Sequence, residues 1–463
     1  MNEPLDLAGL RAAQHTLAAP FDLTLTAVES GPLTLRCEEI FRLLPARRLV
    51  ARVHWQGGPA VLKLFFDKSA QRYIERELAG LAKLMQAGIA SPAILGQVNL
   101  LGGARGLLFN YLPGATAIHW RDTESIETTA HMLADLHARG IWQDDLHLDN
   151  FLKCSDGVFA IDGDGVRSQR SPLSEKRSFA NLGVLLAQRP PGEDDSIDRI
   201  GRVYCARRGW SSPGERLSRL RAALVAQRRN RVRRYLAKVQ RDCTSFSVAR
   251  NFGEYRVCIR ERLPDLGNLL EAPETSMAVG TSLKTGNSAT VVRVAISPSE
   301  SVVMKRYNVK NVLHGLRRAL KPRARFRLAW INGQRLQFLN IPTARPLALI
   351  EKRAGPWRGV AYLLAEDLGD LDLLAEVRRR GLSARRCAQV TEIFVNLRRV
   401  GLTHGDTKAS NFLVYDDRLF LIDLDAMVEG TQGQKKDLER FLQNWEAPER
   451  QRFEEAFQQA GLV

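Results

Sequence analysis

Two stretches of the chain place an asparagine shortly after an aspartate, with the same spacing in both. Asp145 is followed by Asn150, and Asp406 is followed by Asn411. A carboxylate can orient an attacking hydroxyl group and accept its proton, and an amide oxygen can bind Mg²⁺. The spacing is common in loops, so by itself it is weak evidence of catalysis.

Each pair has the same partners in the same order. Asp162 and Asp423 each follow a short apolar segment downstream of the pair, and Lys63 and Lys305 each lie in a β-rich segment upstream. A lysine can neutralise nucleotide phosphates, and a further carboxylate can complete a magnesium site. An ordered repeat of this kind does not arise by chance, so the sequence predicts a duplicated site for phosphoryl transfer to a hydroxyl group.

The two predicted sites differ in their accessory residues. Glu77 lies on a predicted helix after Lys63 and can pair with that lysine, whereas the corresponding place in the second half is Ala329. In the second half, Gly286 and Ser288 belong to a glycine-containing lid that can offer backbone N–H groups to phosphates.

The first half has Leu44-Pro-Ala-Arg-Arg48 at the place of that lid, and Gln143-Asp144 where the second half has His404-Gly405. Each site therefore departs from the full pattern. We expect the second site to be the catalyst, because its loop and lid are closer to the pattern.

The residue patterns predict the elements that hold these residues. In the first half they predict strands over 49–55, 60–65 and 107–112, and helices over 71–86 and 127–139. In the second half they predict strands over 290–296, 301–307 and 360–364, and helices over 326–339 and 388–400. We expect an α+β chain with a first domain over 25–250, a linker over 251–269 and a second domain over 270–463.

The catalytic motifs of the second half resemble those of a known superfamily. His404-Gly-Asp406-Thr-Lys408-Ala-Ser-Asn411 resembles the catalytic loop of protein-kinase-like enzymes. Leu421-Ile-Asp423-Leu-Asp425 resembles their metal-binding segment, with Leu-Asp replacing the usual Phe-Gly. Together with Met304-Lys305-Arg-Tyr307 and Ile341-Pro-Thr343, these motifs look like bacterial lipopolysaccharide core kinases, which phosphorylate heptose or Kdo sugars.

The resemblance covers most of both halves and implies two tandem protein-kinase-like bilobal domains, each with a small β-rich N-lobe and a helical C-lobe. It implies ATP and Mg²⁺ as cofactors and the following roles. The catalytic bases are Asp406 and Asp145; the nucleotide-binding residues are Lys305, Lys63, Glu77, Gly286, Ser288 and Lys408; the metal ligands are Asn411, Asp423, Asn150 and Asp162.

Charge points to anionic partners. The net charge is +17, residues 216–241 contain no acid, and a second acid-free stretch lies between Glu300 and Glu351. These basic segments suit the anionic face of the inner membrane or phosphorylated core oligosaccharide. No nucleic-acid recognition motif is present, and scattered cysteines without a leader favour a cytoplasmic, peripherally attached protein.

Three functions remain open on the sequence. The first is a kinase for a sugar hydroxyl of the lipopolysaccharide inner core, with core oligosaccharide or a lipid-linked acceptor as partner. The second is an atypical Ser/Thr/Tyr protein kinase, and the third is a pseudokinase-type binding protein in core assembly. The short segment after Asp423 lacks a long activation loop, which favours a small or lipid-linked acceptor over a protein.

Overall fold

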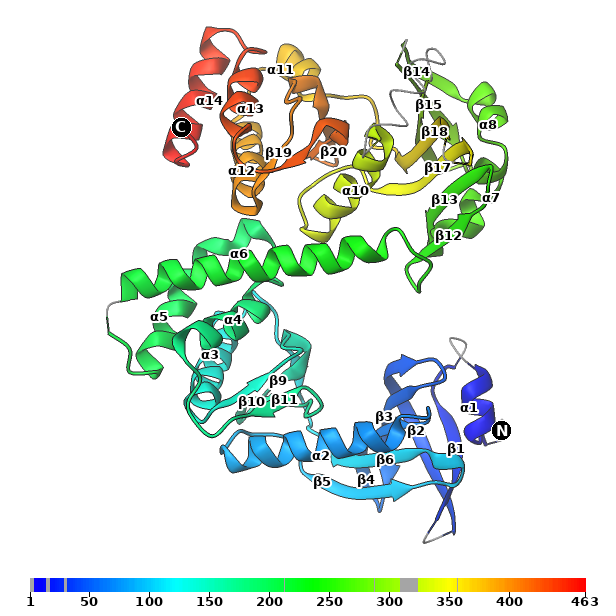
Figure 1. The fold of residues 1–463 in the computed structure, drawn as a ribbon, viewed down its shortest axis with the longest axis vertical. Coiled ribbons are helices and arrows are strands. Elements are labelled where there is room, and N and C mark those ends of the chain that lie inside the picture. Colours follow the sequence, from blue (N-terminus) through cyan, green and yellow to red (C-terminus); the bar gives the residue numbers. More distant parts are fainter. Residues whose placement is uncertain are drawn as a thin grey trace. The chain divides into compact units, whose positions relative to one another are not determined.

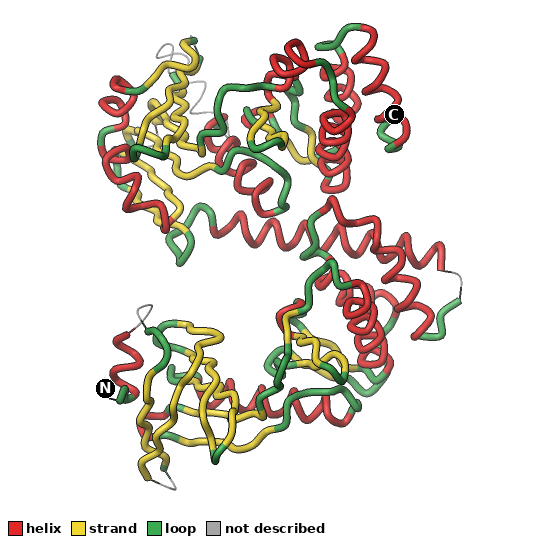
Figure 2. The backbone as a smooth tube through the Cα atoms, turned by 180° about the vertical axis from the view of Figure 1, so that it is seen from behind, coloured by secondary structure: helices red, strands yellow, loops and turns green. Residues whose placement is uncertain are grey.

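A computed structural model describes residues 4–13, 17–28, 31–211, 213–286, 288–308, 324–355 and 357–463. The chain forms two compact units, residues 1–188 with 196–227 and residues 189–195 with 228–463. In each unit a β-rich part precedes a mainly helical part (Figures 1 and 2). The predicted α+β class, with a β-rich part ahead of a helical part in each half, is confirmed. No helix among the described residues is long and apolar enough to cross a membrane.

The first unit opens with a short helix, α1 (Leu7–Ala13), and an antiparallel sheet of order β1-β2-β3-β4-β6-β5. The strands are β1 (Phe21–Ala27), β2 (Gly31–Leu44), β3 (Arg48–Trp55), β4 (Gly58–Phe65), β5 (Ile94–Asn99) and β6 (Arg105–Asn110). Between β4 and β5 runs α2 (Ala70–Gln86). Its buried residues Ile74, Leu81 and Leu84 recur with helical spacing, which is why this segment forms an amphipathic helix.

The helical part of the first unit carries the polar loop. Its helices are α3 (Thr123–Ala138), α4 (Glu175–Leu186), α5 (Ile197–Arg207) and the start of α6 (Pro213–Lys238). Its short strands are β7 (Thr116–Ala117), β8 (Ile141–Gln143), β9 (Phe151–Cys154), β10 (Gly157–Ala160) and β11 (Val166–Ser168). Strands β9 and β10 form a hairpin that places Asn150 before one strand and Asp162 after the other.

The second unit contains an antiparallel sheet of order β12-β13-β17-β18-β16-β15-β14. The strands are β12 (Phe246–Arg250), β13 (Glu254–Ile259), β14 (Thr281–Thr285), β15 (Ala289–Ala295), β16 (Ser301–Tyr307), β17 (Pro346–Ala354) and β18 (Trp357–Glu366). Three helices accompany it, α7 (Leu263–Glu271), α8 (Pro273–Val279) and α10 (Arg325–Phe338). Residues 309–323, which belong to the second acid-free basic stretch, lie outside the described residues.

The rest of the second unit is mainly helical. Its helices are α11 (Leu373–Arg380), α12 (Ala384–Val400), α13 (Gln434–Leu442) and α14 (Ala447–Gln459). Its strands are β19 (Leu402–Thr403), β20 (Phe412–Tyr415), β21 (Arg418–Leu421) and β22 (Val428–Glu429). Buried phenylalanines of α12, β20, α13 and α14 contact one another edge to face and form the core beneath the polar loop.

The predicted domain boundaries need correction. The first domain was predicted over 25–250 and the linker over 251–269, yet β12 and β13 both belong to the second sheet, where Cys258 of β13 pairs with Ala348 of β17. The apolar residues of β13 are buried, so the sheet is extended at this edge by residues that precede the predicted domain. Asn251 and Gly253, at the start of the predicted linker, form the turn between β12 and β13.

The basic segment 216–241 falls mostly on helix α6, and part of its charge is neutralised. Arg228 forms a two-pronged ion pair with Asp194, with both oxygens 2.7 Å from the guanidinium, and its side chain is only 4% exposed. Arg216 and Arg219 pair with Glu175. The prediction that Arg228 binds an anionic surface is therefore wrong, because its charge is buried and paired. Arg229, Arg233 and Arg234 are exposed.

Candidate functional site

In the first unit, a buried ion pair joins the sheet to helix α2. Lys63 Nζ on β4 lies 2.7 Å from Glu77 Oε1 and 3.2 Å from Asp162 Oδ1. The carboxylate of Glu77 is fully buried, and this burial raises its pKa, whereas the charge of Lys63 lowers it. The sequence predicted this pairing from position alone. The contact leaves the ammonium group fixed between two carboxylates.

Helix α2 can approach the Asp162 segment closely because two glycines lie at the crossing. A Cβ atom added to Gly80 would lie 1.8 Å from the carbonyl oxygen of Gly163, and one added to Gly163 would lie 2.4 Å from the carbonyl oxygen of Glu77. Neither position has room for any side chain. The backbone N–H of Gly163 also donates to Glu77 Oε1 at 3.3 Å.

The polar loop of the first unit is fixed by side chains that bond to its backbone. Asn150 Nδ2 donates to the Asp145 carbonyl oxygen at 2.8 Å, and Gln143 Nε2 donates to the Asp162 carbonyl oxygen at 3.0 Å. The carboxylate of Asp145, by contrast, is 92% exposed. The loop is therefore ordered, while the side chain proposed as its base points into solvent.

In the second unit, Lys305 contacts the two acids of the predicted metal-binding segment, and helix α10 supplies no glutamate to pair with it. Its Nζ lies 2.6 Å from Asp423 Oδ1 and 3.6 Å from Asp425 Oδ2. Burial opposes the charge of Lys305, but Tyr307, Asp423 and Asp425 outweigh it and raise the lysine pKa. Arg325, at the start of α10, adds a cation 2.8 Å from Asp425. Helix α10 has no acid, as the alignment with Ala329 predicted.

The polar loop of the second unit is held by contacts equivalent to those of the first. Asn411 Nδ2 donates to the Asp406 carbonyl oxygen at 2.8 Å, and His404 Nε2 donates to the Ile422 carbonyl oxygen at 3.1 Å. His404 Nδ1 accepts from the Asp406 backbone N–H at 3.2 Å, so the ring is neutral with its proton on Nε2. Burial lowers the pKa of His404, which favours this neutral form.

A second layer of residues holds the loop. Asp437 on α13 accepts hydrogen bonds from the backbone N–H groups of His404 at 2.6 Å and Gly405 at 2.9 Å. Buried Asn332 on α10 donates to the carbonyl oxygens of Leu424 at 3.0 Å and Met427 at 2.9 Å, which fixes the segment after Asp423. Sequence analysis missed both residues, because their partners lie far along the chain and no motif includes them.

The two candidate bases sit in different surroundings. The Asp406 carboxylate is 24% exposed and lies 2.5 Å from Arg440 and 3.7 Å from Lys408. In the part of the chain that the structure describes, the carboxylate of Asp145 pairs only with His147, at 3.8 Å. Lys408 is half exposed and points to Asp406. The second unit therefore holds its carboxylate in place, and the first does not.

Asp423 has a left-handed backbone, with φ 60° and ψ 53°. Among the described residues with positive φ, Asp162 does not appear. Gly286 and Ser288 flank the β14–β15 turn, where Asn308 Nδ2 donates to the Gly286 carbonyl oxygen at 3.2 Å. Asn287 lies outside the described residues, so the predicted lid is described only at its ends.

The donor sets suit a magnesium–nucleotide complex. The amide nitrogen of Asn411 bonds to the loop backbone, which would leave its oxygen for a metal ion, and the same holds for Asn150. Among the described residues, no group of three or more His, Cys, Asp or Glu is placed so that it could hold a metal ion by itself. Phosphate oxygens and water would therefore have to complete the coordination of a metal here, as is usual for Mg²⁺.

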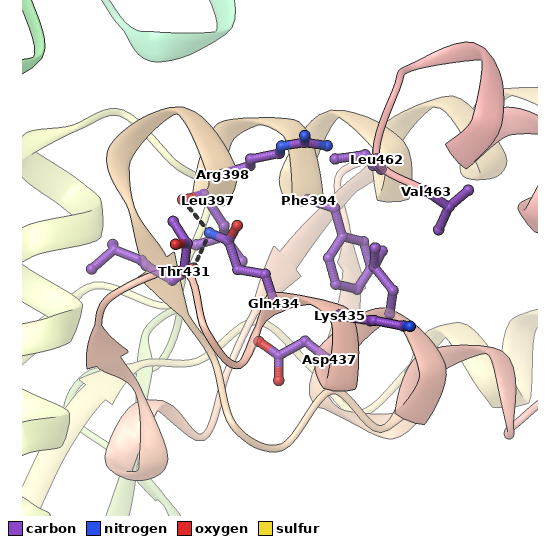
Figure 3. Close-up of a pocket in the computed structure, with 11 residues that line it drawn as sticks. Phe394, Leu397, Arg398, Thr431, Gln434, Lys435, Asp437, Leu462 and Val463 are labelled. Carbon is purple, nitrogen blue, oxygen red and sulfur yellow. Dashed lines mark hydrogen bonds between the residues drawn. The ribbon is translucent and has the colours of Figure 1, made fainter. Parts of the chain in front are cut away.

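A pocket of about 750 Å³ has Asp437 among its lining residues (Figure 3). Phe394, Leu397 and Leu438 form its apolar wall, and Gln434 donates to the carbonyl oxygens of Leu397 and Leu402 at its edge. The pocket contains none of the residues predicted to bind nucleotide or metal. It shares Asp437 with the residues that hold the loop, so we do not assign nucleotide binding to it.

The comparisons with known proteins give one family match, and it falls on the second unit. Residues 280–460 match the lipopolysaccharide kinase (Kdo/WaaP) family. This confirms the predicted resemblance for the second unit; the duplication stays a prediction. A comparison with curated proteins found no match. Among solved structures, vaccinia related kinase 3 is similar at 14% identity and a TM-score of 0.26, over 35% of this chain and 56% of that one. The chain thus spans about half of that structure, and so remote a likeness carries no argument.

Proposed function

We propose that the chain transfers the γ-phosphoryl group of ATP to a sugar hydroxyl of the lipopolysaccharide inner core, a heptose or Kdo, and that the second unit performs the transfer. The observation that carries this proposal is the set of contacts in residues matched to the family. Lys305 lies 2.6 Å from Asp423, and Asn411 is tied to the loop that presents Asp406.

Each of these residues has a task in the proposed reaction. Lys305 would neutralise nucleotide phosphates, and Asn411 with Asp423 would hold Mg²⁺, which supplies charge compensation at the transferred phosphoryl group. Asp406 orients the acceptor hydroxyl and accepts its proton. Arg440 and Lys408 form ion pairs with this carboxylate and hold it in position.

The acceptor is proposed to be lipid-linked, which would place the reaction at the anionic cytoplasmic face of the inner membrane. The exposed residues Arg229, Arg233 and Arg234 of α6 support this, because they add cationic charge that no described acid neutralises at contact distance. No nucleic-acid partner is proposed.

Transfer of labelled phosphate from ATP to isolated core oligosaccharide tests the proposal. Wild-type chain should label the oligosaccharide, and Asp406→Asn should reduce transfer by at least about a hundred-fold, the usual contribution of a positioned base. Asp145→Asn is the matched control and should retain transfer. Label on protein hydroxyls alone would favour an atypical protein kinase, and no transfer with intact nucleotide binding would favour a pseudokinase-type binding protein.

A further inference from the structure

In the first unit, the place of the glycine lid is taken by a tight turn followed by an arginine. Strands β2 and β3 are joined by Pro45-Ala46-Arg47, with the Arg47 N–H donating to the Leu44 carbonyl oxygen at 3.0 Å. Ala46 has a positive φ of 56°. A turn this short has no run of free backbone N–H groups with which to surround phosphates. A different group has to contact phosphates in this site if nucleotide binds there.

The strand register identifies Arg48 as that group. On the sheet, Val50 pairs with Lys63 and Arg48 pairs with Phe65. Directly paired residues share a face of a sheet, and so do residues two apart along a strand. Arg48 therefore lies on the same face as Lys63, one pair closer to the turn.

The second unit has a small residue at the equivalent place. There Val291 pairs with Lys305, and Ala289 pairs with Tyr307. Counting from the lysine, Ala289 is the counterpart of Arg48. The unit with a glycine-containing turn has no side-chain cation at this position, and the unit without such a turn has an arginine.

The surroundings of Arg48 suit a cation that binds an anionic ligand. Its Nε is buried and has no hydrogen-bond partner among the described residues, although its guanidinium lies 5.8 Å from the centre of the Phe65 ring. Burial lowers the pKa of Arg48, and nearby carboxylates oppose this shift, namely Asp162, Glu77 and Asp164. A partly buried guanidinium near the metal-segment acids, with an unused donor, suits a phosphate oxygen.

We propose that Arg48 is a phosphate-binding residue of a nucleotide site in the first unit, where its side chain replaces the backbone donors of a glycine lid. Lys63, Glu77 and Asp162 already form the ion-pair cluster of such a site. Because the Asp145 carboxylate is exposed, whereas the Asp406 carboxylate is held by Arg440, we expect this site to bind nucleotide without catalysing transfer. The inference rests on the proposed use of ATP by the chain.

Calorimetry on the full chain, with the second site disabled by Lys305→Ala and Asp423→Asn, tests the inference. We expect one equivalent of Mg·ATP to bind, and Arg48→Gln to weaken this binding about ten- to a hundred-fold, the range for a lost charge-assisted hydrogen bond. Adenosine, which has no phosphate, should bind equally well to the chain with Arg48 and to the Arg48→Gln variant. Arg48→Lys keeps the positive charge and should therefore lose less affinity for Mg·ATP than Arg48→Gln does.

Arg47→Gln is the matched control, because Arg47 is next in sequence but is held by Asp67 and Tyr73. It should leave ATP affinity unchanged. The inference is overturned if no nucleotide binds in the disabled background, if Arg48→Gln weakens ATP and adenosine equally, or if only the melting temperature falls. Transfer by the wild-type second site is measured separately, so failure here leaves the proposed function standing.

Discussion

Asp437 accepts a hydrogen bond from the backbone N–H of His404 at 2.6 Å, from a helix that begins after the metal segment. The same carboxylate binds the N–H of Gly405. The aspartate fixes two consecutive peptide groups just before Asp406. It thereby connects α13 to the position of the candidate base, without touching any residue predicted to bind nucleotide.

Asp437→Ala should lower kcat for transfer by about ten- to a hundred-fold, because a small displacement of the base disrupts the near-attack geometry. The KM for ATP should change little, since Lys305 and Asp423 keep their contact. Steady-state kinetics check this. Asp437→Asn retains one acceptor oxygen, so its kcat should lie between those of wild type and Asp437→Ala. A rise in KM with unchanged kcat would contradict the positioning role.

Gly80→Ala should destabilise the first unit by at least about 1–3 kcal/mol, because its Cβ would clash with the Gly163 carbonyl oxygen and push α2 from the metal segment. Urea unfolding measures this. Gly96→Ala is the control: a Cβ at Gly96 meets nothing within 4 Å. Equal stability of the two variants would show that α2 does not pack as described.

His137 should make the first unit sensitive to acid. Its Nε2 donates to Asn181 Oδ1 at 3.0 Å, and its Nδ1 accepts from the Tyr204 hydroxyl at 2.7 Å, an arrangement that requires a neutral ring. Burial lowers the pKa of His137 from 6.5 to about 4. Between these values the unfolded chain binds the proton and the folded chain does not, so stability is complete above about pH 6.5 and declines as pH falls toward 4.

Urea unfolding between pH 4 and 7 checks this dependence. His137→Gln should flatten the dependence of the free energy of unfolding on pH between pH 4 and 7, and it should lower stability at neutral pH. His131→Gln, at an exposed position on the same helix, should leave the slope unchanged. An unaltered slope in His137→Gln would assign the acid sensitivity to other groups.

The exposed arginines of α6 should attach the chain to anionic vesicles. Replacing Arg229, Arg233 and Arg234 by Gln should weaken binding by roughly a hundred-fold at low salt, at about 1 kcal/mol for each cation. Co-sedimentation with phosphatidylserine vesicles measures this, and salt should weaken the wild-type interaction as well. Transfer to a soluble acceptor should persist.

Arg228→Gln is the matched control, because this arginine lies on the same helix but is buried against Asp194. It should lower the melting temperature and leave vesicle binding intact. If the triple variant binds vesicles as well as wild type does, the membrane role of α6 has to be abandoned.

The elements nearest the chemistry could be predicted from the sequence. The helix expected over 71–86 spans Ala70–Gln86, and the strand expected over 301–307 spans Ser301–Tyr307. Both have strong periodicity in residues that face the core. Strand β2 was not predicted, because most of its residues are exposed or half buried and its alternation is weak.

The residues proposed to contact nucleotide, metal or acceptor could be predicted, because motifs of fixed spacing contain them. The supporting residues were not. Asn332 reaches a carbonyl oxygen 92 positions away, and Asp437 reaches back across the metal segment to His404. Such contacts follow from packing between elements, which local patterns do not encode. The ion pair of Lys63 with Glu77 was an exception, since its helix position could be counted from the strand.

The left-handed backbone of Asp423 limits which residues its position can tolerate. Aspartate, asparagine and glycine adopt this conformation readily, whereas an alanine there would add about 1–2 kcal/mol of backbone strain. Asp423→Asn therefore removes the charge alone, while Asp423→Ala combines charge loss with distortion of the loop. At Asp162, outside that conformation, alanine carries no such strain. The same alanine substitution is thus a different chemical experiment in each half of the chain.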